Sequence, residues 1–298
     1  MTFFKNKTAG DIVFDLVVYL LLALVFVIIA YPLYFIIIAS ISDSTLVSTG
    51  KVTLFPRNMS LFGYKQIFQD SRIWTGYTNT IIYTFLGTAV NLLFTLPAAY
   101  VLSRPEFRAR RVIMFLFVFT MFFSGGLIPT YLLIKDIHMV NSMWVFILPF
   151  CVNVFNLIIA RTFFESSIPK DLFEAASMDG CTHFQFFTKV ALPLSKAVVS
   201  VIGLYYLVAH WNDFFTGLIY IRSNNLQPLQ IILRDILLSN QVFSQGAGAG
   251  GAAGGYAQQY ADQVKYAVII VSTVPILLVY PFIQKYFDKG VMIGSVKG

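Results

Sequence analysis

Apolar runs long enough to cross a lipid bilayer recur along the whole chain and constrain its fold more than any other feature. A helix needs about 20 mostly apolar residues to cross the hydrocarbon core, and six runs approach or exceed this length. They are residues 16–42, 77–103, 112–134, 142–160, 197–221 and 266–282, the last with an extension to 287. Only 12% of the residues are charged, about half the share in a soluble domain. The sequence therefore predicts an all-α integral membrane protein with six transmembrane helices.

The first run follows a short basic start with Lys5 and Lys7, an arrangement that secretory signal peptides share. The apolar core of a signal peptide is only about 7–15 residues long, whereas residues 16–42 carry no charge at all. We therefore expect an uncleaved membrane anchor, preceded by a cytoplasmic segment at residues 1–15.

The distribution of Lys and Arg sets the expected orientation. With the N-terminus inside and six crossings, most of the 21 basic residues fall on the cytoplasmic side. The densest cluster, residues 104–111, falls inside, as the positive-inside rule requires. We therefore expect a multi-pass protein of the cell membrane, surrounded by lipid, with a membrane domain at residues 16–287. Loop 161–196 and tail 288–298 should be cytoplasmic, and loop 222–265 should lie outside. The net charge of +7 then reflects topology, and we expect no nucleic-acid partner.

Motifs that carry chemistry are scarce. The chain has no HExxH, GxSxG, GxxxxGK[ST] or paired-Cys metal pattern. Its three histidines, His138, His183 and His210, have no partners at ligand spacing, and Cys151 and Cys181 are expected to be packing residues. We expect no catalytic residue, no metal and no cofactor in this chain. If transport is driven by ATP, the nucleotide and its Mg must be bound by another chain.

One polar stretch, residues 168–196, interrupts the apolar pattern and is typical of two short helices joined by a turn. Pro169 suits the first helical position, with Ser167 as a cap. Asp171 and Glu174 would then lie in the first turn, where carboxylates favour the positive end of the helix dipole.

Gly180 should end this first helix in a left-handed conformation. Thr182 and Gln185 form a capping box that starts the second helix, and Pro193 should end it. The residues expected to share one face of this second helix are Phe184, Phe187, Val190 and Ala191.

The spacing within this stretch resembles the EAA loop of ABC importer permeases, EAA-x3-G-x9-I-x-LP. Here the pattern is Glu174-Ala175-Ala176, Gly180 and then Val190-x-Leu192-Pro193, with Val in place of Ile. The resemblance implies a cytoplasmic loop that docks into a cleft on an ATP-hydrolysing subunit. The residues it implies for this coupling are Glu174, Ala175, Ala176, Asp179, Gly180, Leu192 and Pro193.

Other segments extend the resemblance over most of the chain. Residues 211–214 are similar to the WN-x-F element of carbohydrate-type permeases, and residues 290–298 are similar to their GLTxGAVKG ending, with Ser295 in place of Ala. Residues 125–131 resemble a subgroup associated with complex oligosaccharide uptake. The resemblance implies the type I ABC importer permease fold of the maltose-type, binding-protein-dependent family.

The same resemblance implies several partners. They are a second homologous permease that forms a heterodimer with this chain, two ATPase subunits, an extracytoplasmic solute-binding protein and a sugar oligomer as substrate. It also implies that the end of the tail contacts the ATPase subunits. The tail residues concerned are Gly294, Ser295, Val296, Lys297 and Gly298.

The fifth run is the only one that contains ionisable groups, His210 and Asp213. Charged groups inside a membrane are costly and usually functional, and a spacing of three lets both share one helix face. Alternatively, they lie near the outer interface and only snorkel toward water. The candidate substrate path comprises Asn153, Tyr205, His210, Trp211, Asn212 and Asp213. Of these, Trp211 and Asn212 are the residues we most expect to meet the sugar, since neutral polar and aromatic groups suit hydroxyls.

Two alternatives from other classes stay open on the sequence alone. A proton-coupled secondary transporter would use Asp213 as its proton site, but it would typically show inverted repeats, and none is apparent. An integral-membrane enzyme is disfavoured by the missing catalytic motifs. In the outer loop, residues 226–238 predict a short amphipathic helix, and the Gly-rich residues 246–255 are either a tolerated insertion or a partner contact.

Overall fold

The computed structural model describes residues 8–246, 264–279 and 281, and all regular secondary structure within these ranges is helical. The chain divides into two compact units. One consists of Met1–Gln69 with Asp235–Val271, and the other consists of Asp70–Arg234 with Ser272–Gly298. The predicted ATPase-contact residues 294–298 lie outside the described ranges. Within these ranges the prediction of an all-α protein is confirmed.

The first unit is dominated by α1 (Ala9–Ser40), which exposes apolar side chains on all its faces. A capping box starts this helix: the Asp11 N–H donates to Thr8 Oγ1 at 3.4 Å, and the Thr8 N–H donates to Asp11 Oδ2 at 2.9 Å. The short helices α2 (Ser44–Ser48) and α3 (Phe62–Gln69) follow. The buried core of this unit comprises Ile38, Ala39, Val47 and Val52.

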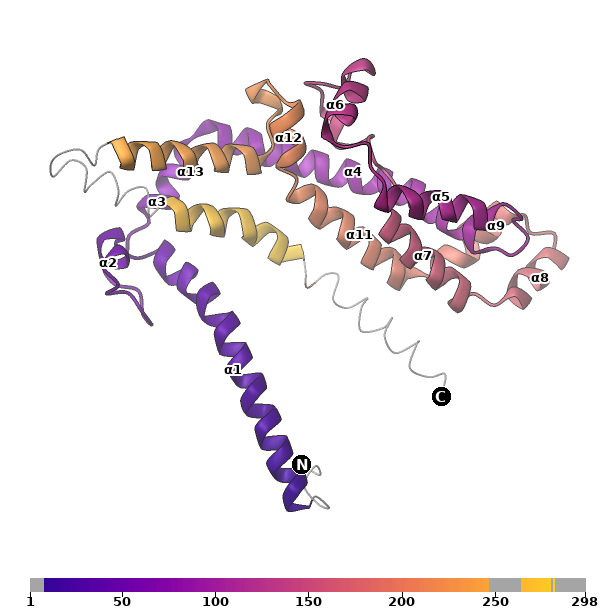
Figure 1. Ribbon diagram of the computed structural model, residues 1–298, viewed down its shortest axis with the longest axis horizontal. Coiled ribbons are helices and arrows are strands. Elements are labelled where there is room, and N and C mark those ends of the chain that lie inside the picture. Colours follow the sequence, from indigo (N-terminus) through magenta and orange to yellow (C-terminus); the bar gives the residue numbers. More distant parts are fainter. Residues whose placement is uncertain (1–7, 247–263, 280, 282–298) are drawn as a thin grey trace. The chain divides into compact units, whose positions relative to one another are not determined.

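The second unit is built along α4 (Ser71–Ser103), against which α7 (Val154–Ser167) and α11 (Lys196–Trp211) pack (Figure 1). Between membrane helices, van der Waals contacts of closely packed side chains and interhelical hydrogen bonds stabilise this packing. The core residues at these contacts include Leu96, Ala99, Tyr100, Leu157, Phe164 and Ile202. Asp70 caps α4 by accepting the Arg72 N–H at 2.9 Å. The Arg72 guanidinium also hydrogen-bonds this carboxylate and lowers the pKa of Asp70 below its usual value.

The third predicted span, residues 112–134, is not a single helix. It is divided between α5 (Arg110–Phe122) and α6 (Leu127–Asp136), whose axes are bent by 114°. The connection contains Gly126 with φ +85°, a conformation that glycine adopts without a steric penalty. The expectation of one continuous helix is therefore wrong for this run.

The fourth and fifth predicted spans are also interrupted. Residues 142–160 contain the 3₁₀ helix η1 (Met143–Phe146), an irregular segment with Phe150 at φ +58°, and the first part of α7. Residues 197–221 are divided between α11 and α12 (Phe215–Tyr220), with a break in between. These interruptions place helix ends and irregular backbone at the pocket of the second unit that is described below.

Among the described residues, α1 and α4 are long and apolar enough to cross a membrane. The number rises to four if each of two bent pairs is one span: α5 with α6, and residues 183–194 with α11. Residues 264–279 form a shorter apolar helix, and the extension to 287 lies outside the described ranges. The count of six spans thus stays a prediction.

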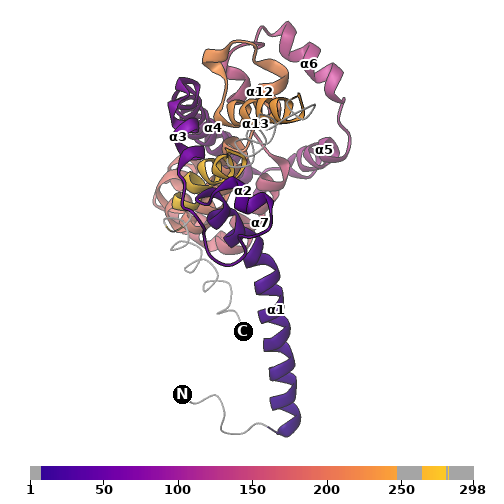
Figure 2. The same cartoon turned by 90° about the vertical axis from the view of Figure 1, so that its left-hand side faces the viewer.

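Helices α6 and α12 lie beside one another although they are far apart in the sequence (Figures 1 and 2). The rings of Tyr131 and Tyr220 stack with centroids 5.8 Å apart. Asn141 connects the two segments further. Its Oδ1 accepts the N–H groups of Arg222 at 3.0 Å and Ser223 at 2.9 Å, and its own N–H donates to the Tyr220 carbonyl at 2.8 Å. The loop before η1 is thereby fixed against the end of α12.

The helix predicted at residues 226–238 is present, but it begins later and is longer. A 3₁₀ turn, η3 (Asn224–Leu226), precedes α13 (Leu229–Gly246). Gln227 between them is extended, with φ −67° and ψ 134°. The ring of the following Pro228 excludes helical backbone at the residue before it, so the helix starts only after the proline. Of the Gly-rich stretch, residues 247–255 lie outside the described ranges.

Candidate functional site

The EAA-like loop, residues 161–196, contains α8 (Lys170–Met178) and a second helical segment that begins at His183. Gly180 has φ +80°, as expected. Its N–H donates to the Ser177 carbonyl at 3.0 Å, and the Cys181 N–H donates to the Ala176 carbonyl at 3.0 Å. This pair of bonds is a Schellman motif, which satisfies the last carbonyls of α8 and fixes the turn.

The predicted capping box at the start of the second helical segment is confirmed. The Thr182 N–H donates to Gln185 Oε1 at 3.0 Å, and the Gln185 N–H donates to Thr182 Oγ1 at 3.3 Å. The predicted start of α8 is wrong in two details. Ser167 is the last residue of α7 and caps nothing in α8, because Pro169 has extended backbone and is itself the N-cap. Since α8 then begins at Lys170, Glu174 lies in its second turn.

The second helical segment contains a π-helix, Phe187–Ala191, which the sequence pattern did not predict. The wider turn rotates the residues before it, so that Phe186 is buried and Phe184 is 75% exposed. The expected common face of Phe184 and Phe187 is therefore wrong.

The predicted helix end at Pro193 is also wrong. Pro193 lies inside α10 (Leu192–Leu194), and the chain turns at Ser195 by 84° into α11. The segment from His183 to Leu194 is one continuous helix, and the π-turn before Pro193 widens it where the missing N–H interrupts the hydrogen-bond ladder.

No residue of α8 is buried. Glu174 and Ala175 are exposed, and the Met178 side chain is 89% exposed. The helix is nevertheless fixed, because the Phe173 ring stacks on His183 at 4.5 Å and meets the Phe186 ring edge-on at 5.1 Å. The loop thus presents a rigid, uncovered helix face with an apolar side chain at its end, a surface suited to docking on another protein.

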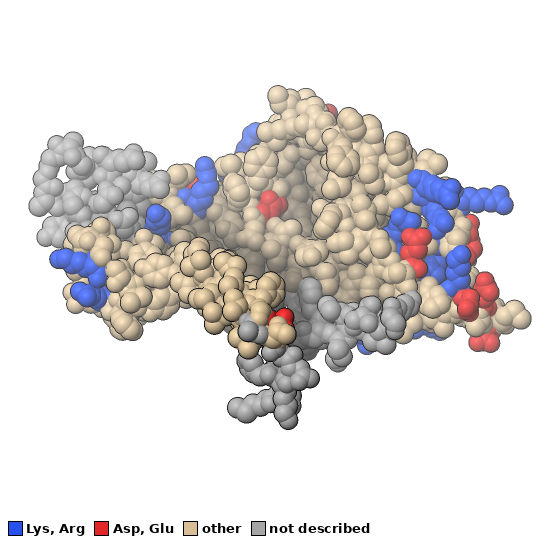
Figure 3. Space-filling view, turned by 60° about the horizontal axis from the view of Figure 1, so that its bottom comes forward, with Lys and Arg blue, Asp and Glu red and all other residues tan. Residues whose placement is uncertain are grey.

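Charged side chains gather at the end of the molecule that carries α8 and α9 (His183–Phe186) (Figure 3). Some of them connect helices. Arg104 is 5% exposed, donates to the Phe164 carbonyl at 3.1 Å and lies 4.9 Å from the centre of the Tyr100 ring. Arg161 donates to the Leu102 carbonyl at 3.1 Å and pairs with Glu165 at 2.9 Å. Part of the Arg cluster predicted from topology therefore joins α4 to α7.

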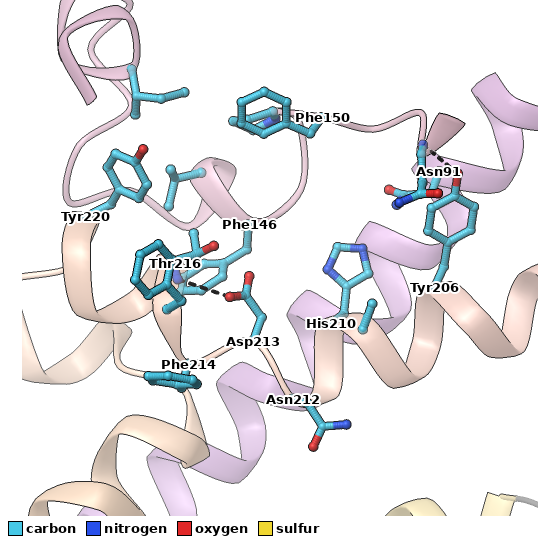
Figure 4. A pocket seen from close by; sticks show the side chains of 16 residues that line it. Asn91, Phe146, Phe150, Tyr206, His210, Asn212, Asp213, Phe214, Thr216 and Tyr220 are labelled. Carbon is cyan, nitrogen blue, oxygen red and sulfur yellow. Dashed lines mark hydrogen bonds between the residues drawn. The ribbon is translucent and has the colours of Figure 1, made fainter. Parts of the chain in front are cut away.

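A pocket of about 440 Å³ lies where α11 breaks before α12. It is lined by side chains from α4, α6, the segment around η1, α11 and α12 (Figure 4). Of the six predicted path residues, four line it: Asn153, His210, Asn212 and Asp213. The pocket is also lined by residues that the prediction did not include. Among them are Asn91, Phe146, Phe150, Tyr206, Thr216 and Tyr220.

The four predicted residues that line the pocket differ in what they do. Asp213 Oδ1 accepts the Thr216 N–H at 3.0 Å and so supports the start of α12. Asn153 caps α7 through its Oδ1. Asn212 Nδ2 donates to the Val208 carbonyl at 2.9 Å, and Figure 4 shows its side chain turned away from those of His210 and Asp213. His210 and Asp213 are therefore the predicted residues whose side chains project most directly into the pocket.

Trp211 and Tyr205 lie outside this pocket. Trp211 is 6% exposed, its Nε1–H donates to the Ser272 carbonyl at 3.0 Å, and its ring lies 6.4 Å from that of Tyr77. It thus packs between helices on another side of α11. Tyr205 is 43% exposed; it neither lines the pocket nor shares the contacts of Trp211.

The pocket residues missed by the prediction differ in how visible they are in the sequence. Asn91 is a polar residue within an apolar run, and this contrast identifies it in the sequence as a candidate pocket residue. Tyr206 and Phe146 carry no such signal, because an aromatic residue in an apolar run is ordinary. Only packing of α11 and η1 against α4 brings them together. Within the described ranges, no cluster of three or more His, Cys, Asp or Glu side chains is placed to hold a metal ion.

Bilayer-length apolar helices and a polar pocket at a helix break are features typical of membrane transport proteins. Residues 72–293 match the family described as "Binding-protein-dependent transport system inner membrane component", and the chain belongs to this family. It is a permease component of such a transport system, as the EAA-like spacing predicted.

Two relatives from Bacillus subtilis (strain 168) align over nearly the whole chain. The polygalacturonan/rhamnogalacturonan transport system permease protein YtcP is 40% identical, with 96% of this chain and 98% of the relative covered. Protein LplC is 39% identical, with 98% and 97% covered. A solved bacterial ABC transporter involved in the import of the acidic polysaccharide alginate contains a chain with a TM-score of 0.83 and 33% identity, covering 95% of this chain and 99% of that one. The type I importer permease fold predicted from the sequence is confirmed.

Proposed function

We propose that this chain is the permease subunit of an ATP-driven importer of oligosaccharides and forms half of its translocation path with a second, homologous permease. The observation that carries the proposal is the 40% identity to a polygalacturonan/rhamnogalacturonan permease over almost the full length of both chains. The alginate importer, at 33% identity, supports the same substrate class. Within this class, we propose oligogalacturonides as the substrate to test first.

The coupling of ATP hydrolysis to transport is proposed to pass through the EAA-like loop. Its α8 is uncovered, rigidly capped at Gly180 and ends in the exposed Met178. These properties suit an element that docks on an ATPase subunit, where ATP and Mg would be held. At its other end, the loop continues through the turn at Ser195 into α11, which leads to His210 at the pocket. A solute-binding protein would deliver the sugar from outside.

We further propose that both termini and the EAA-like loop are cytoplasmic and that residues 222–265 face outward. The support is the concentration of Arg between residues 104 and 111. A cysteine at Gly248 should then react with an impermeant thiol reagent in intact cells, whereas a cysteine at Gln185 should react only after the membrane is opened. Labelling in the reverse order would overturn this orientation.

A decisive test of the function is uptake of labelled oligogalacturonides by cells that carry the complete importer, with and without the ATPase subunit. ATP-driven import predicts that uptake requires the ATPase and survives dissipation of the proton gradient while ATP is maintained.

The proton-coupled alternative predicts that uptake collapses with the gradient and is abolished in Asp213→Asn. In the proposed importer, this variant keeps an oxygen that accepts the Thr216 N–H and retains ATP-dependent uptake. Uptake that needs the gradient but no ATPase would replace the proposal with the alternative.

A further inference from the structure

Five polar side chains follow one face of α4 at spacings of three and four residues, which places them in a row. They are Thr80, Thr84, Thr88, Asn91 and Thr95. The two at the ends are paired: Thr80 Oγ1 accepts the Leu229 N–H at 2.8 Å, and Thr95 Oγ1 lies 2.7 Å from the Tyr206 hydroxyl. The three in the middle have buried side-chain oxygens without a hydrogen-bond partner among the described residues. Of these three residues, only Asn91 lines the pocket.

His210 of α11 packs directly on the backbone of this row. A Cβ atom built on Gly87 would lie 2.5 Å from the Cε1 and Nε2 atoms of the imidazole, so glycine is what makes room for the ring. His210 Nε2 is itself buried without a hydrogen-bond partner among the described residues. Gly87 and Asn91 are four residues apart on α4, which places Asn91 one turn from the imidazole. Both side chains reach the pocket (Figure 4).

Tyr206 completes the floor of the pocket but is already engaged. Its hydroxyl lies 2.7 Å from Thr95 Oγ1 and accepts the Asn153 N–H at 3.0 Å. Unpaired buried polar atoms cost free energy, and native proteins keep few of them. Here two such atoms, Asn91 Oδ1 and His210 Nε2, belong to residues that both line a cavity of a size typical for small-molecule sites. Their hydrogen-bonding capacity is unused in this state, and a ligand in the pocket reaches it once the two side chains turn toward the cavity.

The rim of the pocket carries a second unusual feature. Phe150 lines the pocket with its side chain 74% exposed and its backbone at φ +58°. A bulky residue in the left-handed region is strained, and such strain is retained where the surrounding structure enforces it, often at ligand sites. Phe146 on the same side is buried and stacks on Tyr83 at 4.5 Å. The pocket therefore offers an exposed aromatic ring opposite a polar floor.

We propose that Asn91 and His210 form a subsite that hydrogen-bonds neighbouring hydroxyls of one sugar unit, while Phe150 contacts the C–H face of the same unit. This inference rests on the proposed import of oligosaccharides and names what this permease recognises in them. Among the described residues, no Lys or Arg lines the pocket, and Asp213 is the only carboxylate that does. The subsite therefore recognises hydroxyls. A cationic side chain that pairs with an acidic group of the substrate must lie outside this pocket.

The test compares uptake of tetragalacturonate with uptake of the same oligomer acetylated at O2 and O3, which keeps the charge but blocks the hydroxyls. The complete importer, reconstituted in vesicles, is used for both. The preference is the ratio of the two uptake rates, free oligomer over acetylated oligomer. Asn91→Leu should lower this ratio about three- to tenfold relative to the wild type, because one or two hydrogen bonds to the sugar are lost. The same variant should melt at a higher temperature, because it removes a buried unpaired oxygen. A purely structural Asn91 predicts a lower melting temperature and an unchanged preference.

Gly87→Ala tests the second half of the subsite, since the added methyl displaces the imidazole. Its matched control is Gly203→Ala on α11, where the new methyl meets only Leu92 Cδ1 at an ordinary 3.6 Å. Gly87→Ala should reduce the preference and Gly203→Ala should not. A wild-type preference in both Asn91→Leu and Gly87→Ala overturns the subsite while leaving the importer intact. If the wild-type importer takes up neither oligomer, the proposed substrate class is overturned, and this inference with it.

Discussion

The EAA-like loop and the pocket are connected by one helix, α11, yet they are stabilised in different ways. The loop is formed by one continuous stretch, and the bonds that shape it join near neighbours, as between Thr182 and Gln185 or between Gly180 and Ser177. The pocket takes its side chains from α4, α6, the segment between η1 and α7, α11 and α12, and its shape depends on how these segments pack. A change at an exposed position of the loop should therefore disturb the contact with a partner and leave the membrane fold intact, whereas a change at a buried position near the pocket acts on how the helices pack.

The connection between the two regions suits the transmission of movement. The loop turns into α11 at the buried Ser195, and the last turn of α11 holds His210 against Gly87. A helix of this length is about 24 Å long and behaves as a rigid element. A displacement of the loop by an ATPase would thus move one wall of the pocket.

The largest effect that follows from the comparison is expected for Gly180→Val. No atom of the described residues lies within 4 Å of a Cβ built on Gly180, so the cost comes from a φ of +80°, about 1–3 kcal/mol for a residue other than glycine. A β-branched residue should unwind the turn that positions α8. We expect normal membrane insertion with loss of uptake and of substrate-stimulated ATP hydrolysis.

The control for this variant is Gly180→Asn, because asparagine tolerates left-handed backbone far better than valine does. It should retain most of the uptake and ATPase stimulation. Full ATPase stimulation in Gly180→Val would show that the loop does not couple the two activities.

The second-largest effect is expected on stability, for Trp211→Ala. This residue is almost fully buried and its indole donates to the Ser272 carbonyl. Removing a buried aromatic side chain typically costs about 3–5 kcal/mol. The melting temperature should fall, and the uptake per folded molecule should change little. Tyr205→Ala, on the same helix but half exposed, should leave both unchanged. A stable Trp211→Ala importer without uptake would instead place the indole in the sugar path.

The same contrast explains how far the sequence could predict the molecule. The cap of the second loop helix and the left-handed Gly180 follow from residues within a few positions of one another, so a local pattern is sufficient. The π-helix at 187–191 escaped prediction because burial of both Phe186 and Phe187 against the core sets it. Such burial depends on tertiary packing.

The pocket shows the limit more clearly. The helix break after Trp211 carries no proline or glycine in the next five residues, so the run was expected to continue. His210 and Asp213 could be identified because ionisable groups stand out in an apolar run. The α4 residues that lie near His210 or share its pocket, Gly87 and Asn91, could not be assigned from the sequence. Their positions depend on the register between two helices that are distant in sequence.

A smaller effect, confined to the loop, is expected for Met178→Ala. The side chain is 89% exposed, so its removal should not alter the melting temperature. If it anchors the ATPase contact, truncation should weaken ATPase binding about tenfold, measured by titrating ATPase into the solubilised permease pair. Phe122→Ala on α5 removes another apolar side chain, 75% exposed, away from the loop and should leave binding unchanged. Equal binding in both variants would remove Met178 from the interface.

The smallest effect is expected for Asn212→Ala. This variant tests whether a residue that lines the pocket also contacts the sugar. Its amide donates to the Val208 carbonyl at the end of α11, and its side chain is turned away from those of His210 and Asp213. Loss of such an exposed hydrogen bond costs about 0.5–1.5 kcal/mol, so the melting temperature should fall by only a few degrees. Uptake of oligogalacturonides, normalised to protein in the membrane, should change less than threefold, because His210 and Asp213 keep their positions. A loss of uptake as large as that expected for Gly180→Val would mean that Asn212 reaches the sugar in another state of the transport cycle, and that α11 rotates when the loop moves.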